Sequence, residues 1–356
     1  MQQASTDALW AALRLVAPGT PLREGLDRIL QANMGALIVV GDDPDVLSIC
    51  SGGFPLGVDF TPQRFSELAK MDGAIILSAD TRRISRANVH LVPDPDIPTS
   101  ETGTRHRTAE RVARQLALPV VTISEEMSVV SVHVSGQKKT LERIPRVLAR
   151  SDQALQILGR YRLRLDTVMG SLSALEVEDL VTVRDVADVL QRAEMVRRIA
   201  TEVAGYVIEL GIDGRLVQLQ LEELTLGVDE DLRLVLRDYF VRAPDRGTAE
   251  VLGRLDSLDD DSLLDVRALA SVLHLPHDTD LDSSLTPKGY RVLARIPRLS
   301  EELAERIVAR FDSLAKLMRA GIGDLVEIDG IGEVRARMVK DGLSRLAEAS
   351  ILERYS

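Results

Sequence analysis

Aromatic residues and cysteine are scarce in this sequence. Phe, Trp and Tyr make up 3% of the 356 residues, so stacking of nucleic-acid bases on aromatic side chains is not an expected mode of binding. The one cysteine, Cys50, lies in an apolar run. It excludes an intramolecular disulfide and a cysteine-rich zinc site, and it is typical of a protein in a reducing compartment.

Long apolar segments and an excess of basic residues are also missing. No apolar run approaches the ~18 residues that a membrane span needs. The N-terminus lacks the basic flank of a signal peptide, so no signal peptide is expected. We therefore expect a cytoplasmic protein that makes no membrane contact. The net charge of −11 makes the chain as a whole a poor binder of nucleic acid, so any such contact should be local.

The remaining composition is that of a globular protein with more than one domain. Hydrophobic residues make up 45% of the chain and charged residues 28%, which is typical of globular proteins. A length of 356 residues exceeds what one ordinary core holds. Changes in pattern along the chain predict three domains, over residues 1–145, 146–287 and 288–356.

Strand and helix patterns alternate over residues 1–145. Short apolar runs bounded by turn residues predict buried strands, and apolar residues at helical spacing predict helices. The predicted strands are residues 35–40, 46–50, 74–77, 89–92, 119–123 and 128–134, and the predicted helices are residues 8–15, 22–30, 65–69 and 109–116. This mixture predicts an α/β domain with a mixed sheet.

The strand signal ends near residue 140. Leu158, Tyr161 and Leu165 recur at helical spacing and predict a bundle or spine of packed helices. No group of titratable residues in these helices suggests a site, so contact between subunits is their expected role. The aspartates of residues 243–287 are interpreted as solvated turns, because their spacing matches no metal-binding loop.

The most informative stretch is residues 101–111, which places small and basic residues directly before a helical run. Gly103 lets the backbone approach a ligand, and the free N–H groups of the first helical turn are donors. Arg105 and Arg107 add permanently charged forks that match phosphate oxygens. A capped helix with a solvated basic first turn is the alternative, but cations at a helix N-terminus oppose the dipole unless an anion binds there. The stretch therefore predicts a polyphosphate site.

A second motif lies near the C-terminus, where residues 290–356 hold 12 Lys and Arg against 11 Asp and Glu. A Gly-Ile-Gly turn at residues 330–332 separates two predicted helices, which is typical of a helix-hairpin-helix that binds nucleic-acid phosphates without reading base sequence. The predicted DNA-contacting residues are Gly330, Ile331, Gly332, Arg335, Arg337 and Lys340. Residues 296–311 lack the glycine pair and are interpreted as a degenerate partner hairpin. A helical cap for oligomerisation is the alternative for the whole segment.

Two short motifs together are more specific than either alone. Asp72-Gly73-Ala74 precedes a predicted strand, and Thr104-Arg105-His106-Arg107 follows about 30 residues later. This pair resembles the DGA and RHR motifs of diadenylate cyclases, and the helical middle and the hairpins extend the resemblance to the DNA integrity scanning diadenylate cyclases of bacteria. It implies a multidomain α/β protein: a mixed-sheet nucleotide-binding domain, an all-α helical spine and a C-terminal helix-hairpin-helix domain.

The resemblance implies an enzyme that condenses two ATP molecules into cyclic di-AMP and releases two pyrophosphates. Two N-terminal domains would face each other, so that each ribose 3′ hydroxyl attacks the α-phosphorus of the other ATP. It also implies a homo-octamer, Mg²⁺ or Mn²⁺ as cofactor, and binding of branched DNA such as Holliday junctions that regulates activity. A non-catalytic, ATP-sensing protein that binds DNA junctions is the competing hypothesis. Asp72 separates the two, because binding an anion alone needs no carboxylate.

The resemblance also assigns roles to individual residues. Asp72 would hold the divalent metal or help to deprotonate the 3′ hydroxyl, and Glu126 or Glu125, in a polar turn, would reach the metal. The predicted catalytic residues are Asp72, Arg105, His106 and Arg107. The predicted ATP-binding residues are Gly73, Leu91, Thr104, Arg105, His106, Arg107, Thr108 and Ser124, with Leu91 against adenine and residues 104–108 on the phosphates. His90, His133, His274 and His277 are interpreted as structural.

Overall fold

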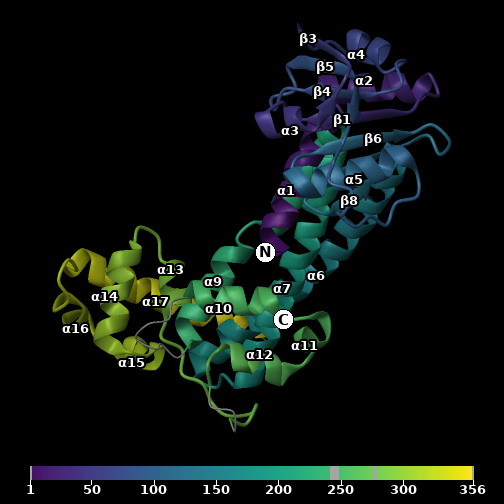
Figure 1. The fold of residues 1–356 in the computed structure, drawn as a ribbon. Coiled ribbons are helices and arrows are strands. Elements are labelled where there is room, and N and C mark those ends of the chain that lie inside the picture. The colour runs from purple at the N-terminus through teal and green to yellow at the C-terminus, as the bar shows by residue number, and fades with distance from the viewer. Residues whose placement is uncertain (1, 241–247, 276–278, 355–356) are drawn as a thin grey trace. The chain divides into compact units, whose positions relative to one another are not determined.

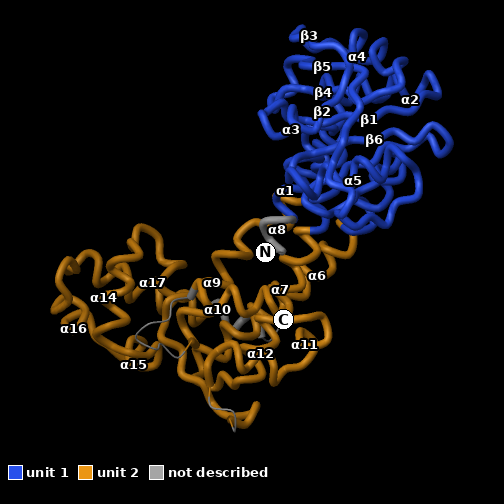
Figure 2. Tube along the Cα trace, viewed as in Figure 1, with its two compact units in different colours: residues 1–154, 202–220 blue, residues 155–201, 221–356 orange. Residues whose placement is uncertain are grey.

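The computed structural model describes residues 2–240, 248–275 and 279–354 of the chain (Figure 1). The chain divides into two compact units (Figure 2), of which unit 1 comprises residues 1–154 and 202–220, and unit 2 comprises residues 155–201 and 221–356. Each unit is therefore assembled from two separate stretches of sequence. The three predicted domains stay a prediction, because the units are defined by compactness alone. His277 and Asp278 lie outside the described residues.

Unit 1 contains an eight-stranded sheet with the order β2-β5-β4-β1-β6-β7-β8, and β3 pairs with β5. Its strands are β1 (Ala36–Val40), β2 (Cys50–Ser51), β3 (Phe54–Asp59), β4 (Ala74–Leu77), β5 (Arg83–Leu91), β6 (Val120–Ser124), β7 (Val129–Val134) and β8 (Gln137–Thr140). β1 runs parallel to β4 and antiparallel to β6. The mixed sheet that the sequence predicts is thereby confirmed.

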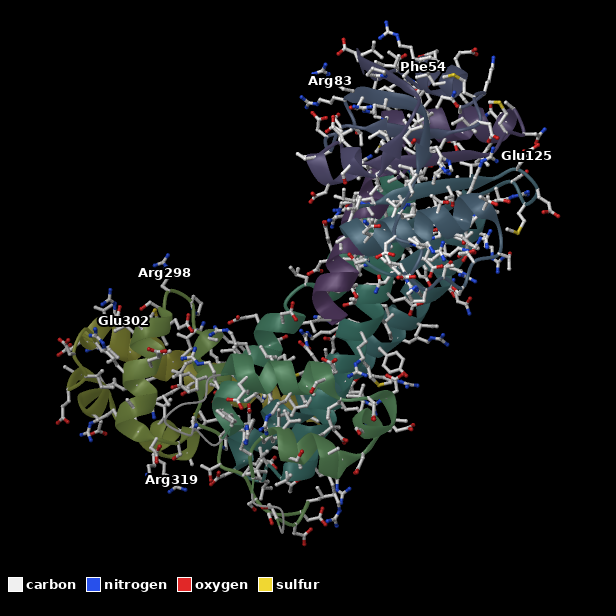
Figure 3. The ribbon with its side chains drawn as sticks, in the orientation of Figure 1. Phe54, Arg83, Glu125, Arg298, Glu302 and Arg319 are labelled. Atoms are coloured by element: carbon white, nitrogen blue, oxygen red, sulfur yellow. The ribbon has the colours of Figure 1, made fainter. Side chains whose placement is uncertain are left out.

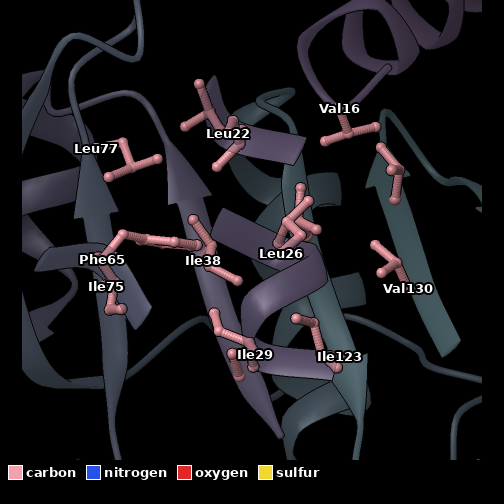
Figure 4. Packing of buried hydrophobic residues seen from close by; sticks show 14 of the residues in the cluster. Val16, Leu22, Leu26, Ile29, Ile38, Phe65, Ile75, Leu77, Ile123 and Val130 are labelled. Carbon is pink, nitrogen blue, oxygen red and sulfur yellow. The ribbon is translucent and has the colours of Figure 1, made fainter. Parts of the chain in front are cut away.

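Helices cover both faces of this sheet. Along β1, Ile38 and Val40 pack into one apolar cluster with α2 (Pro21–Gln31) and α4 (Pro62–Leu68), as Figure 4 shows for Ile38 among Leu26, Ile29 and Phe65. The alternate residues Leu37 and Val39 pack into a second cluster with α5 (Thr104–Leu116). Successive side chains of a strand point to opposite faces of the sheet, so the single apolar run of β1 contributes to two cores, one on each face.

The predicted strand at residues 46–50 is wrong. The chain forms the short helix α3 (Pro44–Ser48) there, because Asp43 accepts a hydrogen bond from the Val46 N–H at 2.9 Å and Pro44 occupies the first helical turn. β2 follows and pairs with β5, not with β1. The sequence analysis also missed β3, in which Pro55 and Gly57 interrupt the apolar alternation.

The named elements among the described residues after the sheet are all helices, which confirms the expected helical region. The next elements are α6 (Ile144–Glu178), α7 (Val183–Leu210), α8 (Arg215–Thr225), α9 (Val228–Tyr239), α10 (Thr248–Ser257), α11 (Asp260–Leu264) and α12 (Val266–Val272), while α1 (Gln2–Leu15) precedes the sheet. None of the described helices combines the length and apolar character that crossing a bilayer requires. The predicted turn at Asp259 is the N-cap of α11, where its carboxylate accepts the Ser262 N–H.

Unit 2 also contains buried charges that the sequence pattern did not indicate. Arg291, on α13 (Tyr290–Ala294), forms an ion pair of 2.6 Å with Glu176 of α6, and both side chains are almost fully buried. The Asp238 carboxylate of α9 accepts the N–H groups of Gly289 and Tyr290 at 2.7 Å each. Burial, together with the charge of Glu176, raises the pKa of Asp238. These contacts attach the C-terminal hairpins to the helical region.

The C-terminal part holds two hairpins with the same backbone shape. The first joins α13 to α14 (Glu301–Phe311), and the second joins α16 (Ile322–Val326) to α17 (Glu333–Arg354), with α15 (Leu314–Arg319) between them. Arg298 (φ +63°) and Gly330 (φ +88°) both adopt the left-handed conformation at equivalent positions. Ile296 and Ile328 occupy matching positions in one shared core. The interpretation of the first hairpin as a glycine-poor copy of the second agrees with this geometry.

Candidate functional site

One edge of the sheet collects the predicted nucleotide-binding residues. β1 and β4 are parallel, with Leu37 opposite Ala74, so both strands begin at this edge. β5 and β6 run antiparallel to them and end there. The topology therefore brings Asp72 and Gly73, which precede β4, beside Leu91 at the end of β5. Ser124, at the end of β6, lies at the same edge of the sheet.

A cavity of about 470 Å³ opens at this edge, a volume typical of small-molecule sites. Six predicted residues line it: Asp72, Gly73, Leu91, Thr104, Arg105 and Thr108. The other lining residues are Leu37, Ser51, Gly52, Gly53, Ala74, Asn88, Val89 and His90. His90 is thus part of the site wall, although the sequence analysis interpreted it as structural. The β2–β3 turn was missed as well, because its only sequence signal was a glycine pair typical of any turn.

Asp72 and Arg105 lie together in this cavity. The Arg105 Nη2 donates to Asp72 Oδ1 at 2.9 Å, and the Asp72 side chain is 94% exposed. Arg105 also packs over Gly35, where an added Cβ would lie 2.3 Å from its Nη1. The guanidinium is therefore held on the β1 side, while the carboxylate faces solvent on nearly all sides.

Asp72 offers one exposed carboxylate to a hard divalent cation, so most of the ligands of such an ion would have to come from a nucleotide and water. Asp72 is the one carboxylate among the described residues that line the cavity, and no group of three or more potential metal-binding side chains occurs in the described part of the chain. Mg²⁺ is commonly bound by one or two carboxylates plus substrate phosphates and water. Asp72 would hold the ion, with the remaining ligands coming from phosphate oxygens and water.

The start of α5 faces the cavity with free backbone donors. Gly103 is its N-cap residue and makes no side-chain capping bond, so the first N–H groups are available to an anion. Thr104, Arg105 and Thr108 line the cavity from this helix. Arg107 is exposed and is not among the lining residues, so its phosphate contact stays a prediction.

His106 points to another side of α5. Its ring is half-buried and lies 6.3 Å from the ring of His133, which is buried on β7. Burial lowers the pKa of His106, and the positive charges of Lys138 and Arg105 lower it further against the opposing effect of Glu101. A neutral imidazole outside the cavity wall is a weak partner for phosphate, so the predicted role of His106 stays untested by this geometry. Burial lowers the pKa of His133 to about 4, and its interpretation as structural stays a prediction.

The turn after β6 does not reach the cavity wall. The Ser124 Oγ accepts the Met127 N–H at 3.2 Å and so stabilises this turn. Glu125 and Glu126 are exposed, and Figure 3 shows Glu125 projecting from the turn. The predicted nucleotide contact of Ser124 and the metal contact of Glu126 stay predictions.

Gly73 is required by packing against the neighbouring strand. A Cβ at this position would lie 2.6–2.8 Å from the backbone and side chain of Asn88, which itself has φ +54°. The sequence analysis predicts Gly73 as an ATP-binding residue; it lines the cavity, and its closest neighbour in the structure is Asn88 of β5. Asn88 is part of an irregular stretch of pairing between β4 and β5.

We expect Gly73→Ala to destabilise unit 1 by about 1–3 kcal/mol, because the methyl group overpacks against backbone that has little room to move. Gly103→Ala is the matched control, since its Cβ would meet only His106 Nδ1 at an ordinary 3.5 Å. Thermal unfolding of both variants measures the difference. Equal melting temperatures for the two would contradict this account.

Some of the predicted DNA-contacting residues of the second hairpin are exposed to solvent, whereas others are buried or hydrogen-bonded within the protein. Gly332, Arg335 and Arg337 are exposed, and Arg335 Nη1 donates to the Gly330 carbonyl at 2.8 Å. Ile331 is buried in the hairpin core. The Lys340 Nζ donates to the Met318 and Ala320 carbonyls at 2.7 and 2.8 Å, so its ammonium is occupied at the end of α15.

Arg306, which the sequence analysis did not single out, also contacts the second hairpin. It extends from α14 of the first hairpin, and its Nη1 donates to the Asp329 carbonyl at 2.9 Å and to Asp329 Oδ2 at 3.0 Å. The first hairpin itself is ill-suited to phosphate, because Glu301 and Glu302 occupy the first turn of α14. Figure 3 shows Arg298 and Glu302 on this hairpin.

Two family models match this chain, one over most of the mixed-sheet region and one over the helical region that follows. Residues 23–138 match the family model for the nucleotide-binding domain of the DisA bacterial checkpoint controller. Residues 141–281 match the model for the linker region of the same controller. The two matches together place in this chain the nucleotide-binding domain and the linker region of a bacterial checkpoint controller.

Curated relatives extend this match over nearly the whole chain. The DNA integrity scanning protein DisA of Frankia casuarinae is 55% identical over 351 residues, 98% of each chain. The protein of the same name from Streptomyces coelicolor is 53% identical over 349 residues, 97% of this chain and 93% of its own. This chain belongs to the DisA family of DNA integrity scanning proteins. A solved structure of DacA from Staphylococcus aureus is also similar, at 21% identity with a TM-score of 0.26 over 39% of this chain and 87% of its own.

Proposed function

We propose that this protein is a diadenylate cyclase that condenses two ATP molecules into cyclic di-AMP and two pyrophosphates. The observation that carries the proposal is the single cavity in which the Asp72 carboxylate, the Arg105 guanidinium and the N-terminus of α5 meet. The guanidinium and the helix N-terminus suit a triphosphate. The carboxylate adds a proton acceptor or a cation ligand, which the binding of an anion alone does not require. Membership of the DisA family supports the same activity.

Each half of the reaction makes one phosphodiester bond. The 3′ oxygen of one ATP bonds to the α-phosphorus of the other, the bond from that phosphorus to the pyrophosphate oxygen breaks, and the hydroxyl proton leaves. Asp72 accepts this proton or, in its alternative role, would hold the divalent cation. Arg105 and the first N–H groups of α5 stabilise the charge that grows on pyrophosphate. Mg²⁺ or Mn²⁺, when bound, would neutralise phosphate charge.

The proposal requires two copies of the chain. One chain contributes one Asp72 and one Arg105, whereas the product joins two nucleotides, so two cavities must face each other. An apolar stripe on α8 and the turn before it supports self-association: Ile212 and Leu216 are each 72% exposed and Leu219 is 50% exposed. Leu216 and Leu219, three residues apart on α8, share one face of the helix, and Ile212 lies on the 3-10 turn before it. The homo-octamer implied by the family resemblance is part of the proposal.

Specific activity is expected to rise with protein concentration and then reach a plateau, because only associated subunits hold two ATP molecules face to face. Product formation per mole of subunit, measured from dilute to concentrated protein alongside the oligomeric state by light scattering, checks this. A constant specific activity in a demonstrated monomer would exclude the facing arrangement.

DNA binding is the second part of the proposal. The exposed Gly332, Arg335 and Arg337 offer a backbone donor and charge to phosphates. Several such hairpins on one oligomer would gain affinity for branched DNA, such as a Holliday junction, through avidity. Occupation of the hairpins by a junction would change how two cavities face each other and thereby regulate the cyclase.

The direct test is to incubate the purified protein with ATP and Mg²⁺ or Mn²⁺ and to identify the product by mass. The cyclic dinucleotide plus two equivalents of pyrophosphate is the expected result. The competing function is a non-catalytic ATP sensor that binds DNA junctions. Tight ATP binding with no product under either metal would favour that function.

A further inference from the structure

The segment between β5 and α5 connects two walls of the cavity. It comprises residues 92–103, which contain three prolines and form neither helix nor strand. Leu91 lines the cavity immediately before it, and Thr104 lines the cavity immediately after it. Leu91 shares an apolar cluster with Ala109 of α5, so packing on the sheet positions the body of this helix, and the segment determines how the chain enters its first turn. Proline restricts the backbone but removes N–H donors, so side chains must hold the segment in place.

Glu110 holds the middle of the segment. Its Oε2 accepts the Thr99 hydroxyl at 2.6 Å and the Ser100 N–H at 3.0 Å. Its Oε1 accepts Arg114 Nη2 at 2.6 Å. The residue is only 8% exposed, and hydrogen bonds to a charged, buried group are the strong ones.

The next polar residues of α5 extend the attachment. Arg111 Nε donates to the Ile97 carbonyl at 2.9 Å, and Arg114 Nη1 donates to the Pro98 carbonyl at 2.9 Å. The Gln115 Oε1 accepts the Asp94 N–H at 2.9 Å. Four residues on one side of the helix thus bind residues 94–100 through five hydrogen bonds, and Glu110 is the one nearest to the start of α5.

The charge of Glu110 is stabilised by these contacts. Burial raises the pKa of the carboxyl, but the hydrogen bonds from Thr99 and from the Ser100 N–H, with the charge of Arg114, outweigh that effect and lower it. The side chain therefore stays ionised at neutral pH. It does not line the cavity, so it cannot touch a nucleotide bound there.

We propose that Glu110 is a positioning residue, which fixes residues 97–100 and thereby the point at which the chain enters the phosphate-binding first turn of α5. The proposal rests on the proposed nucleotide function of the cavity. A residue that acts in this way affects nucleotide affinity through the shape of the site. A residue that only stabilises the fold lowers the melting temperature and leaves the affinity of the folded protein unchanged.

The test compares three variants of the full chain. Glu110→Ala should weaken ATP binding about tenfold, because the segment loses two hydrogen bonds to a charged group. Glu110→Gln keeps an oxygen acceptor for the Ser100 N–H and should recover part of that loss. Thr99→Val removes one donor from the segment, together with the bond that Thr99 accepts from the Glu101 N–H, and tests the same contact if Glu110→Ala folds poorly.

Val112→Ala is the matched control. Val112 is fully buried on the same helix and belongs to the apolar cluster under the sheet, so its truncation destabilises α5 without removing a contact to residues 94–100. Equilibrium binding of ATP, KM, kcat and thermal unfolding are measured for every variant. The proposal is overturned if Glu110→Ala changes ATP affinity and KM no more than Val112→Ala does.

These measurements test the positioning role of Glu110 separately from the proposed cyclase activity. If the wild-type protein binds ATP and forms no cyclic di-AMP, the cyclase assignment fails, while the affinity comparison still decides the role of Glu110. If the wild-type protein binds no ATP, both fail. Normal affinity in Glu110→Ala with normal product formation by wild type rejects only the positioning role.

Discussion

Asp72→Asn is expected to reduce formation of cyclic di-AMP by about 100-fold or more, while ATP binding persists. The amide keeps the shape of the side chain, but it neither accepts the 3′ hydroxyl proton nor binds a divalent cation strongly. Folding should change little, because the ion pair with Arg105 is exposed and such pairs contribute little to stability. The loss should therefore appear in kcat more than in KM.

Glu67→Gln is the control for this experiment. Glu67 and Lys70 form an exposed ion pair of 2.7 Å in unit 1, and neither residue lines the cavity. Its substitution removes one carboxylate charge with no loss of product expected. Wild-type turnover by Asp72→Asn, measured with both Mg²⁺ and Mn²⁺, would remove Asp72 from the catalytic machinery.

Gly332→Leu is expected to weaken binding to a four-way junction about ten- to a hundredfold, the effect of losing a hydrogen bond to a charged phosphate. A Cβ at Gly332 meets nothing within 4 Å, so the hairpin keeps its fold while the side chain shields its backbone donors. Gly330 is a poorer choice, because its φ of +88° and contacts with Leu303 and Arg306 add strain to any substitution. Binding is measured as a titration at two salt concentrations, since phosphate contacts weaken with salt.

Gly323→Leu provides the matched comparison. Gly323 lies on α16 of the same hairpin pair, and its Cβ also meets nothing within 4 Å. Both variants should melt at similar temperatures, with only Gly332→Leu losing junction affinity. Equal junction binding by the two would reject the hairpin as the DNA site, and retained binding by a 1–289 truncation would reject the whole C-terminal domain.

Local patterns predicted the buried strands of the sheet, because strands such as β1 and β4 are uninterrupted apolar runs, but they missed β3 and β8, which are exposed or only half-buried. Residues 46–50 are also apolar, and there the capping by Asp43 outweighed strand propensity. The sequence motifs located Asp72 and Arg105 correctly at one cavity. They did not reveal that Gly73 packs on Asn88 or that Lys340 binds carbonyls of α15. Those contacts join residues far apart in the chain, so no local pattern contains them.

The two-part composition of unit 1 has a consequence for protein synthesis. Residues 202–220 complete this unit: Glu209 pairs with Lys139 at 3.1 Å and accepts the Glu142 N–H, and the Ile212 N–H donates to the Pro18 carbonyl. At roughly 5–20 residues per second, a ribosome needs about 4–16 s to extend the chain from residue 140 to residue 220. During that interval the nascent sheet lacks the helix end that packs against it. Unit 1 therefore completes its packing only after residue 220 has been made. A message truncated before that point would give a chain that holds all the residues of the cavity but lacks the contacts that Glu209 and Ile212 make with the rest of the unit.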